Sequence, residues 1–315
     1  MEILDLRHFL SSDLRRLLDE EVELWGGLLS WDYRSSTDMI LRYVDAKILP
    51  GYAAVERGSI IGYSFFVYEG SKGVIGDLFV SRTRPDARAI ETNLLQHVIE
   101  TLQESPGVHR VEAQLLTHVT GELAAPFLSN GFQRYRRLFL ALQLAGDGAP
   151  TFPPVRPLKD TQIRRWTEHD YQAAAGIITA AYRSHIDSEI NDQYRTNAGS
   201  MRFLNNIVRF PGCGVFDNDS SYVAIHKPSG ALIGLILCSR IRHDVGHVTQ
   251  VCLLPEHRGA GIGENLLAAS YNALRSRSLT QLSLTVTEAN RNAVELYRRI
   301  GFHQMRVFDA FVWEG

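Results

Sequence analysis

The sequence predicts a mixed α/β chain that folds as two similar domains, each a twisted, mixed sheet flanked by helices. A repeat carries this prediction: Tyr52 and Tyr222 are 170 positions apart, and so are Gly131 and Gly301. Short apolar runs and segments of helical periodicity also follow one another in the same order in both halves. A near-constant spacing across a whole domain indicates an internal duplication.

Each half begins with a predicted hairpin. Residues 52–55 and 222–225 are short apolar strands, and a turn rich in glycine and serine follows each of them. The next strand carries an early glycine in both halves, Gly62 and Gly234, 172 positions apart. The two hairpins therefore occupy equivalent places in the two predicted sheets.

A strand and then a helix follow each hairpin. Residues 78–80 and 252–253 are apolar ends of strands. The helix after each of them contains the tripeptide Asn-Leu-Leu, at 93–95 and at 265–267. A Gly-Phe pair then precedes the last strand of each half, which completes the repeat.

The segment between the halves is rich in glycine and proline, a composition typical of a linker that is partly stiff. We therefore predict a first domain over residues 1–147, a linker over 148–157 and a second domain over 158–315.

Residues 250–263 of the second half combine a strand end with a glycine-rich turn. Pro255 ends the strand, and leucines at helical spacing predict a helix after the turn. Turn amides and helix N-terminal amides converge on one centre, which makes this arrangement a common anion site. Glu264 and Asn265 follow the last glycine, where a P-loop needs Lys and Ser or Thr. The third glycine also comes one residue too early for a dinucleotide fingerprint, and a glycine-rich connection without a ligand stays open.

A second stretch supports a ligand site. Residues 282–287 alternate between apolar and polar, which predicts a strand. Asn290 stands where a helix N-cap belongs, and Gly301 where the helix ends.

Together the two stretches resemble the two signatures of the GNAT N-acetyltransferase superfamily. The first is Arg258-x-x-Gly-x-Gly, and the second is Asn290-x-x-Ala-x-x-Leu-Tyr followed by Gly301-Phe302. The resemblance spans roughly residues 246–312 and, with the repeat, indicates a tandem GNAT-domain protein.

This resemblance implies acetyl-CoA as the donor of an acetyl group that passes directly to an amine, without an acyl-enzyme. The backbone N–H at about Leu253 would polarise the carbonyl. The cofactor-binding residues that the resemblance implies are Leu253, Leu254, Pro255, Arg258, Gly259, Ala260, Gly261, Ile262, Gly263, Asn290, Ala293 and Tyr297.

Three residues are candidates for proton transfer. Tyr297 is the candidate acid, because a phenol with an ordinary pKa of about 10 can protonate a leaving thiolate at neutral pH. His247 is a candidate base if it shares a strand face with Val251 and Leu253, and a packing role stays open for it. Glu288 follows the next strand, where a solvated charge is the alternative.

The first copy differs at the same places, and we predict that it is degenerate. The connection at 81–91 contains no glycine, Glu91 stands close to where a pyrophosphate would lie, and Phe127 answers Tyr297. Its arginines could hold an anion or simply form a solvated loop.

The acceptor is expected to be a small-molecule or peptide amine, bound between the first helix and the hairpin of the second copy. Carboxylates alternate with aromatic residues there, which suits a cationic amine, although a polar loop is the alternative. The segment contains Tyr182, His185, Asp187, Glu189, Asp192 and Tyr194.

Composition limits the kinds of partner, site and cellular location that we expect for this chain. The 315 residues include 33 basic and 35 acidic side chains, so no nucleic-acid footprint is expected. Cys213, Cys238 and Cys252 are scattered, so neither a metal site nor a disulfide framework is predicted. No run is long enough to span a membrane and no signal peptide is recognised, so we expect a cytoplasmic protein. Oligomerisation is left open, and a non-catalytic acyl-CoA sensor or scaffold is the alternative to an enzyme.

Overall fold

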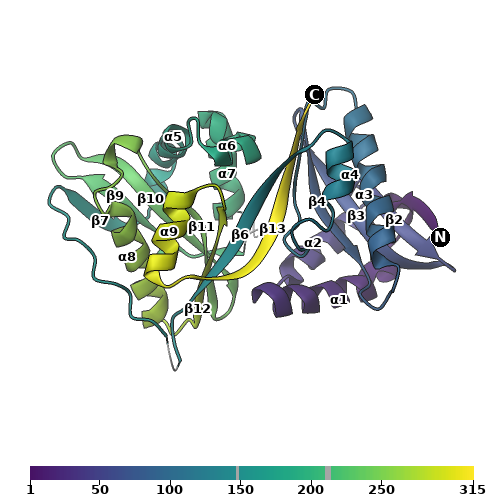
Figure 1. Ribbon diagram of the computed structural model, residues 1–315, viewed down its shortest axis with the longest axis horizontal. Helices are drawn as coiled ribbons and strands as arrows, with labels where there is room; N and C mark the ends of the chain where they lie inside the picture. Colours follow the sequence, from purple (N-terminus) through teal and green to yellow (C-terminus); the bar gives the residue numbers. More distant parts are fainter. Residues whose placement is uncertain (147–148, 210–213) are drawn as a thin grey trace. The chain divides into compact units, whose positions relative to one another are not determined.

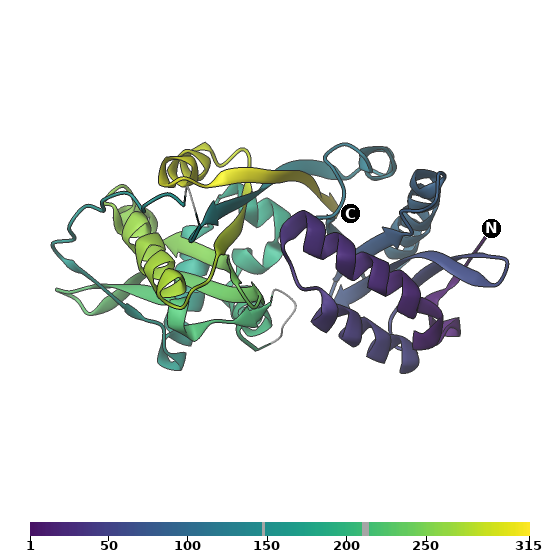
Figure 2. The ribbon, with the colours of Figure 1, turned by 90° about the horizontal axis from the view of Figure 1, so that it is seen from below.

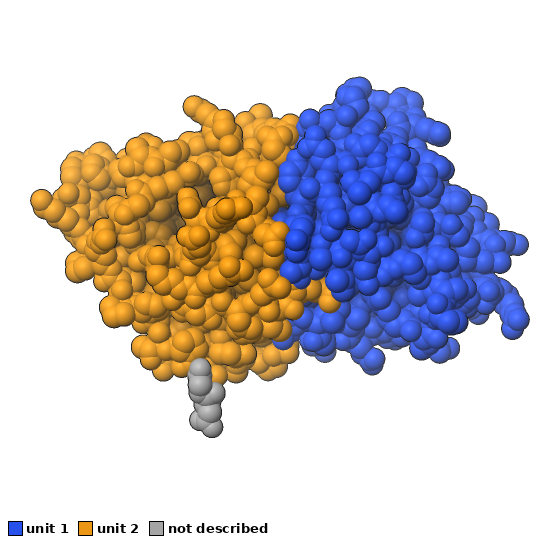
Figure 3. All heavy atoms as spheres, viewed as in Figure 1, with its two compact units in different colours: residues 1–137, 307–315 blue, residues 138–306 orange. Residues whose placement is uncertain are grey.

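The structure, a computed structural model, describes residues 1–146, 149–209 and 214–315 and has the predicted mixed α/β architecture (Figure 1). It forms two compact units. Unit 1 contains residues 1–137 and 307–315, and unit 2 contains residues 138–306 (Figure 3). None of the helices in the described part of the chain combines the length and the apolar character needed to cross a membrane.

The sheet of unit 1 has the strand order β1-β2-β3-β4-β5-β13. All neighbours are antiparallel except β4 and β5, which are parallel. The strands are β1 (Glu2–Asp5), β2 (Gly51–Glu56), β3 (Ser59–Glu69), β4 (Lys72–Val80), β5 (Arg110–Gln114) and β13 (His303–Glu314).

Helices cover both faces of this sheet, and they are α1 (Ser11–Leu29), α2 (Arg34–Asp45), α3 (Ala87–Glu104) and α4 (Ala124–Ser129). A Cβ added at Gly62 of β3 would lie 3.3 Å from Leu94 of α3, whereas the next residue, Tyr63, bonds Glu21 of α1. Successive strand residues point to opposite faces, so α3 and α1 cover different faces. The purple helices α1 and α2 lie together in Figure 2.

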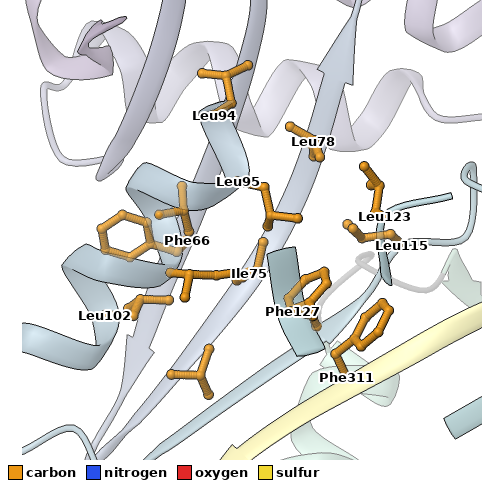
Figure 4. Packing of buried hydrophobic residues seen from close by; sticks show 14 of the residues in the cluster. Phe66, Ile75, Leu78, Leu94, Leu95, Leu102, Leu115, Leu123, Phe127 and Phe311 are labelled. Atoms are coloured by element: carbon orange, nitrogen blue, oxygen red, sulfur yellow. The ribbon is translucent and has the colours of Figure 1, made fainter. Parts of the chain in front are cut away.

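The core on the α3 side is apolar and includes a side chain from the last strand of the chain. Phe311 of β13 is 2% exposed and stacks on Phe127 of α4, with 3.9 Å between the ring centroids (Figure 4). Leu95 and Leu102 of α3 and Ile75 of β4 belong to the same buried cluster.

The sheet of unit 2 has the strand order β6-β12-β11-β10-β9-β7, and β8 pairs with β10. Here β11 and β12 form the parallel pair, as β4 and β5 do in unit 1. The strands are β6 (Gln133–Gln143), β7 (Thr161–Arg165), β8 (Val215–Phe216), β9 (Tyr222–His226), β10 (Ala231–Arg242), β11 (Val245–Leu253) and β12 (Gln281–Thr287).

The helices of unit 2 are α5 (Tyr171–Ala181), α6 (Ile186–Ile190), α7 (Asn197–Arg209), α8 (Ile262–Ser276) and α9 (Arg291–Ile300). Gly246 of β11 lets α8 approach, since a Cβ there would meet Leu274 at 2.9 Å. Cys252 of β11 instead packs in a cluster with Ala174 of α5 and Leu204 of α7. Helix α8 therefore covers one face of the sheet, and α5 and α7 cover the other.

The predicted repeat is confirmed element by element. Both hairpins form, as β2–β3 and β9–β10, and each leads into a strand that pairs in parallel with the next one. Asn290 caps α9, where its Oδ1 accepts from the Ala293 N–H at 3.4 Å. Gly301 ends α9 with φ of 111°, a conformation that glycine adopts without strain.

The last strand of each copy lies in both compact units. Residues 138–143 of β6 belong to unit 2, next to β12, and residues 307–314 of β13 belong to unit 1, next to β5. Each strand has an exposed polar first half and a buried second half, and it is the buried half that joins the sheet of the other copy. The boundaries predicted at 147 and 158 therefore do not coincide with the compact units.

The described part of the predicted linker packs onto α8 within unit 2. The Pro150 carbonyl accepts from the Tyr271 hydroxyl at 3.0 Å, and Phe152 lies 5.1 Å from the Tyr271 ring. The Arg156 carbonyl accepts from the Asn265 side chain at 3.0 Å. The segment is thus fastened along the helix rather than free.

We predict that Phe311→Ala destabilises unit 1 by about 3–5 kcal/mol, because it leaves a cavity against Phe127. Hydrogen exchange should show lost protection in β5 and unchanged protection in β12. Met305→Ala, in the exposed half of the same strand (41% exposed), is the control and should change little. Lost protection in β12 instead of β5 would contradict the pairing of the end of β13 with β5 in unit 1.

Candidate functional site

The parallel pair β11–β12 opens toward the C-terminal ends of its strands. The register runs from Val245 opposite Gln281 to Val248 opposite Leu284. Strand β11 nevertheless continues to Leu253, and β12 to Thr287. The ends of the two strands therefore diverge, which exposes backbone groups of β11 to whatever enters between them.

A bulge lies where the opening begins. On β10, Cys238 faces Val248 and Leu237 faces Gln250, so Thr249 is the extra residue of β11. The Thr249 hydroxyl donates to the Leu237 carbonyl at 3.0 Å and closes the bulge. The bulge reverses the alternation of faces along β11.

The Leu253 N–H points into the opening. Leu254 donates to the Ile233 carbonyl of β10 at 2.9 Å. Because hydrogen-bonded and non-bonded residue pairs alternate in an antiparallel ladder, the Leu253 N–H faces away from β10, toward the diverging β12. The divergence of β11 from β12 leaves the Leu253 N–H without a partner among the described strands on that side. Such a donor suits the predicted role of polarising a carbonyl.

The glycine turn after β11 presents the N-terminus of α8. Pro255 starts a short 3-10 helix (Pro255–His257), and Gly259 and Gly261 follow with φ of 78° and 81°. A Cβ at Gly259 would meet nothing within 4 Å, so the backbone is approachable there. No side chain among the residues that the structure describes caps α8, so its first N–H groups are available to an anion. Ala260 completes this turn, and Ile262 and Gly263 begin α8.

Two arginines lie beside this turn. Arg258, which the sequence proposes as an anion ligand, donates from Nη2 to the Ala181 carbonyl at 2.6 Å and so ties the turn to the end of α5. Arg156 is a residue that sequence reasoning missed. A Cβ at Gly261 would lie 3.4 Å from the Arg156 Cβ, because the linker passes over the α8 N-terminus. Only the packing of the linker reveals this second cation.

Tyr297 lies on α9, 7% exposed, with its ring against Phe302 at 5.6 Å. Burial, together with the charge of Asp187, raises the pKa of its hydroxyl well above the ordinary value. The phenol therefore keeps its proton at physiological pH, as a general acid must.

His247 and Glu288 are less favourable as bases than the sequence suggests. Because of the bulge, His247 does not share a face with Leu253, and it lies in the closed part of the ladder, opposite Ser283. Its Nδ1 is 2.9 Å from the Ser283 hydroxyl, and its ring packs on Phe139. Burial lowers the pKa of His247 to about 3. Glu288 is exposed to solvent.

The segment after α5 brings its own polar groups to the opened strands. The Asp187 carboxylate accepts from the Thr287 hydroxyl, at the end of β12. His185 Nδ1 accepts from the Asp187 N–H at 3.1 Å and caps α6. His185 Nε2 lies 3.3 Å from the Asn290 amide nitrogen. Burial lowers the pKa of His185, so its ring is neutral at physiological pH.

Aromatic rings line the same place. Tyr182 stacks on Tyr194 with 4.3 Å between centroids and meets the His185 ring edge-on at 5.2 Å. Its hydroxyl donates to Gln250 Oε1 at 2.7 Å. Of the predicted acceptor segment, Glu189 instead forms an ion pair with Arg195 at 3.1 Å.

The equivalent place in unit 1 is filled by its own side chains. Glu91, 1% exposed, lies 3.2 Å from His118 Nε2 and 3.2 Å from Arg88. Arg88 also pairs with Glu122 at 2.9 Å. Phe127 is fully buried by ring packing. The Glu91 carboxylate and the His118 imidazole thus occupy the place in unit 1 that corresponds to the glycine turn of unit 2.

Comparison with known proteins agrees with this arrangement. Residues 182–302 match the model of the acetyltransferase (GNAT) family. Residues 182–302 therefore contain a GNAT acetyltransferase domain.

Among curated proteins, the mycothiol acetyltransferase of Thermobifida fusca is 34% identical over 193 residues, which is 55% of this chain. The match spans only 56% of that relative, little more than half its length.

Solved structures show the fold of the whole chain. A GCN5-related N-acetyltransferase from Sphaerobacter thermophilus has a TM-score of 0.66 at 17% identity, with 96% of this chain and 91% of that one covered. A tandem GNAT protein from the clavulanic acid biosynthesis pathway has a TM-score of 0.60 at 16% identity, with 99% and 98% covered. The chain therefore has the fold of tandem GNAT proteins.

We predict that His247 makes folding sensitive to acid. The folded imidazole stays neutral down to about pH 3, whereas an unfolded histidine binds a proton below about pH 6.5. Stability from this group is complete above pH 6.5 and falls as the pH drops. At pH 5 the loss is about 2 kcal/mol.

Urea unfolding of wild type and His247→Gln at pH 7 and pH 5 measures this difference, because all other groups titrate alike in both proteins. The variant should lose about 2 kcal/mol less than wild type between the two pH values. An equal loss in both would show that His247 titrates freely, as a solvent-accessible base does.

Proposed function

We propose that unit 2 is an acetyl-CoA-dependent N-acetyltransferase and that unit 1 is a degenerate copy without cofactor. The observation that supports the proposal is the opened β11–β12 pair, with the N-terminus of α8 following the end of β11. Acetyl-CoA would supply an activated thioester and a pyrophosphate. The acceptor supplies the amine, and the chain supplies the groups that polarise the carbonyl and move protons.

The turn from Arg258 to Gly263 holds the pyrophosphate on its amides and on the start of α8, and Arg156 adds charge from the linker. Leu253 and Leu254 line the arm, Pro255 sets the turn, and Asn290 and Ala293 at the start of α9 complete the binding surface. The residues fit the group, because nothing but open space meets a Cβ built at Gly259.

Direct transfer forms a bond from the amine nitrogen to the carbonyl carbon and breaks the carbon–sulfur bond. The Leu253 N–H stabilises the negative charge that develops on the carbonyl oxygen. The Tyr297 hydroxyl gives its proton to the departing sulfur. The amine proton passes to the Asp187 carboxylate, which Thr287 holds in place.

The degenerate state of unit 1 is supported by its internal ion pairs. A cofactor pyrophosphate at the start of α3 would have to displace Arg88 and His118 from Glu91 and would face that carboxylate. Such a site repels the ligand that unit 2 attracts. A cytoplasmic location is part of this proposal, supported by Cys238 and Cys252, which are free thiols.

A non-catalytic acyl-CoA sensor would use the same turn but would not need a phenol. The buried hydroxyl of Tyr297, with its raised pKa beside Asp187, favours the enzyme. The two functions are separated by release of free thiol from acetyl-CoA with a panel of primary amines.

Gly261→Asp should abolish acetyl-CoA binding in calorimetry. Its carboxylate would face the pyrophosphate, and a side chain is strained at φ of 81°. Circular dichroism should show a folded protein. Wild-type affinity in the folded variant would remove the turn as the cofactor site.

Tyr297→Phe should keep the affinity for acetyl-CoA and lower kcat by about 10²–10⁴, because the hydroxyl acts only when sulfur departs. Tyr43→Phe, at an exposed tyrosine of unit 1, removes a hydroxyl in the same way, is the control and should leave kcat unchanged. A Tyr297→Phe variant with wild-type kcat would make Tyr297 a packing residue.

A further inference from the structure

One buried polar group of unit 2, the side-chain amide of Gln250, takes no part in the proposed acetyl transfer. The Gln250 side chain is 4% exposed, and its Nε2 has no hydrogen-bond partner among the residues that the structure describes. A buried amide donor without a partner costs about 1–3 kcal/mol. Such a cost is tolerated where the group serves a ligand.

The amide is held at its oxygen, on a residue beyond the part of β11 that pairs with β12. Gln250 follows the bulge residue Thr249, at the position where β11 is no longer paired with β12. Its Oε1 accepts from the Tyr182 hydroxyl at 2.7 Å, so the NH₂ group must point elsewhere. Tyr182 is itself fixed by the ring stack on Tyr194.

The repeat offers an internal comparison. Asp77 of unit 1 stands at the same place, opposite Phe65 and next to the bulge of β4, and accepts from the Tyr33 hydroxyl at 2.5 Å. Its other oxygen accepts from the Leu78 N–H at 2.8 Å. Both copies therefore keep a tyrosine bonded to this strand position, but only unit 2 puts a spare donor there.

A carboxylate also lies near Tyr182. The Tyr182 ring meets His185, which caps the helix that contains Asp187. Asp187 is 16% exposed at its side chain and is anchored by Thr287. Asp187 and Tyr297 are both close enough to Tyr182 to contribute to the raised pKa of its hydroxyl. The Asp187 carboxylate, the Tyr297 phenol and the Gln250 amide thus all lie near the Tyr182 side chain.

We infer that the acceptor is a primary amine that carries a carbonyl oxygen beside its amino carbon, as an amino acid amide does. The neutral amino group donates to the Asp187 carboxylate, and the Gln250 Nε2 donates to the carbonyl oxygen. This inference rests on the proposed acetyltransferase function and adds the class of substrate. A site built to bond an oxygen discriminates against an amine that lacks it, because its donor then stays buried and unpaired.

Two amines of equal shape test this. Alaninamide has the carbonyl oxygen, and 3-methylbutan-2-amine replaces its amide group by an isopropyl group. For each we would measure kcat/KM of acetyl transfer by thiol release in the full chain. Comparing variant with wild type for each amine separately cancels their different intrinsic reactivities.

Gln250→Met keeps the volume of the side chain and removes the donor. It should lower kcat/KM at least tenfold for alaninamide and less than twofold for 3-methylbutan-2-amine. Gln250→Glu keeps an oxygen for Tyr182, as Asp77 does for Tyr33, and should show the same selective loss. Gln162→Met, on the exposed side of edge strand β7, is the matched control and should change neither value.

The possible results distinguish failure of the inferred substrate class from failure of the proposed acetyltransferase function. Equal effects of both Gln250 variants on the two amines, or no effect, would overturn the inference while acetyl transfer stands. If 1-amino-2-propanol is as good as alaninamide in wild type and as sensitive to Gln250→Met, a hydroxyl serves as well and the carbonyl assignment is wrong. No turnover of any amine, with no acetyl-CoA binding in calorimetry, would instead refute the proposed function.

Discussion

The separation of β11 from β12 is the constraint on which the site depends. Pairing stops at Val248 and Leu284, so the end of β11 keeps backbone groups that no neighbouring strand uses. A ligand can compensate for that loss, because it can take the place of the missing strand. The Thr249 bulge then turns Gln250 toward α5, while the glycine turn leads into α8 on the other face. The early end of the β11–β12 pairing thus leaves polar groups available on both faces of the sheet, near α5 and near α8.

The duplication shows how the same opening can be closed. In unit 1 the parallel pairing of β4 with β5 also stops early, at Ile75 opposite Ala113. There the groups near the opening satisfy one another, through Glu91 with His118 and Arg88 and through Asp77 with Tyr33. Buried charges are tolerated only when they are paired in this way. Among the described residues of unit 2, by contrast, α8 has no side-chain cap and the Gln250 Nε2 has no hydrogen-bond partner, which supports the proposed ligand site.

Much of this could be predicted from the sequence, because local patterns set local structure. The spacing of Asn290 and Gly301 defined α9, and the glycines before Ile262 defined the start of α8. The pairing of each copy's last strand with the sheet of the other copy could not be predicted. Strands β6 and β13 have the same burial pattern, and either could pair with either sheet. The face of His247 depended on a bulge that adds no sequence signal. The role of Gln250 and the place of Arg156 depended on contacts between distant segments.

The central claim is that the chain binds acetyl-CoA in unit 2 alone. Hydrogen–deuterium exchange of the full chain with and without acetyl-CoA tests it most directly, because it reports both whether and where the ligand binds. We predict increased protection at residues 253–265, around the turn and the start of α8, and unchanged exchange at residues 81–91. Protection at 81–91 would contradict the account, since the ion pairs of Glu91 would then have given way to a second cofactor.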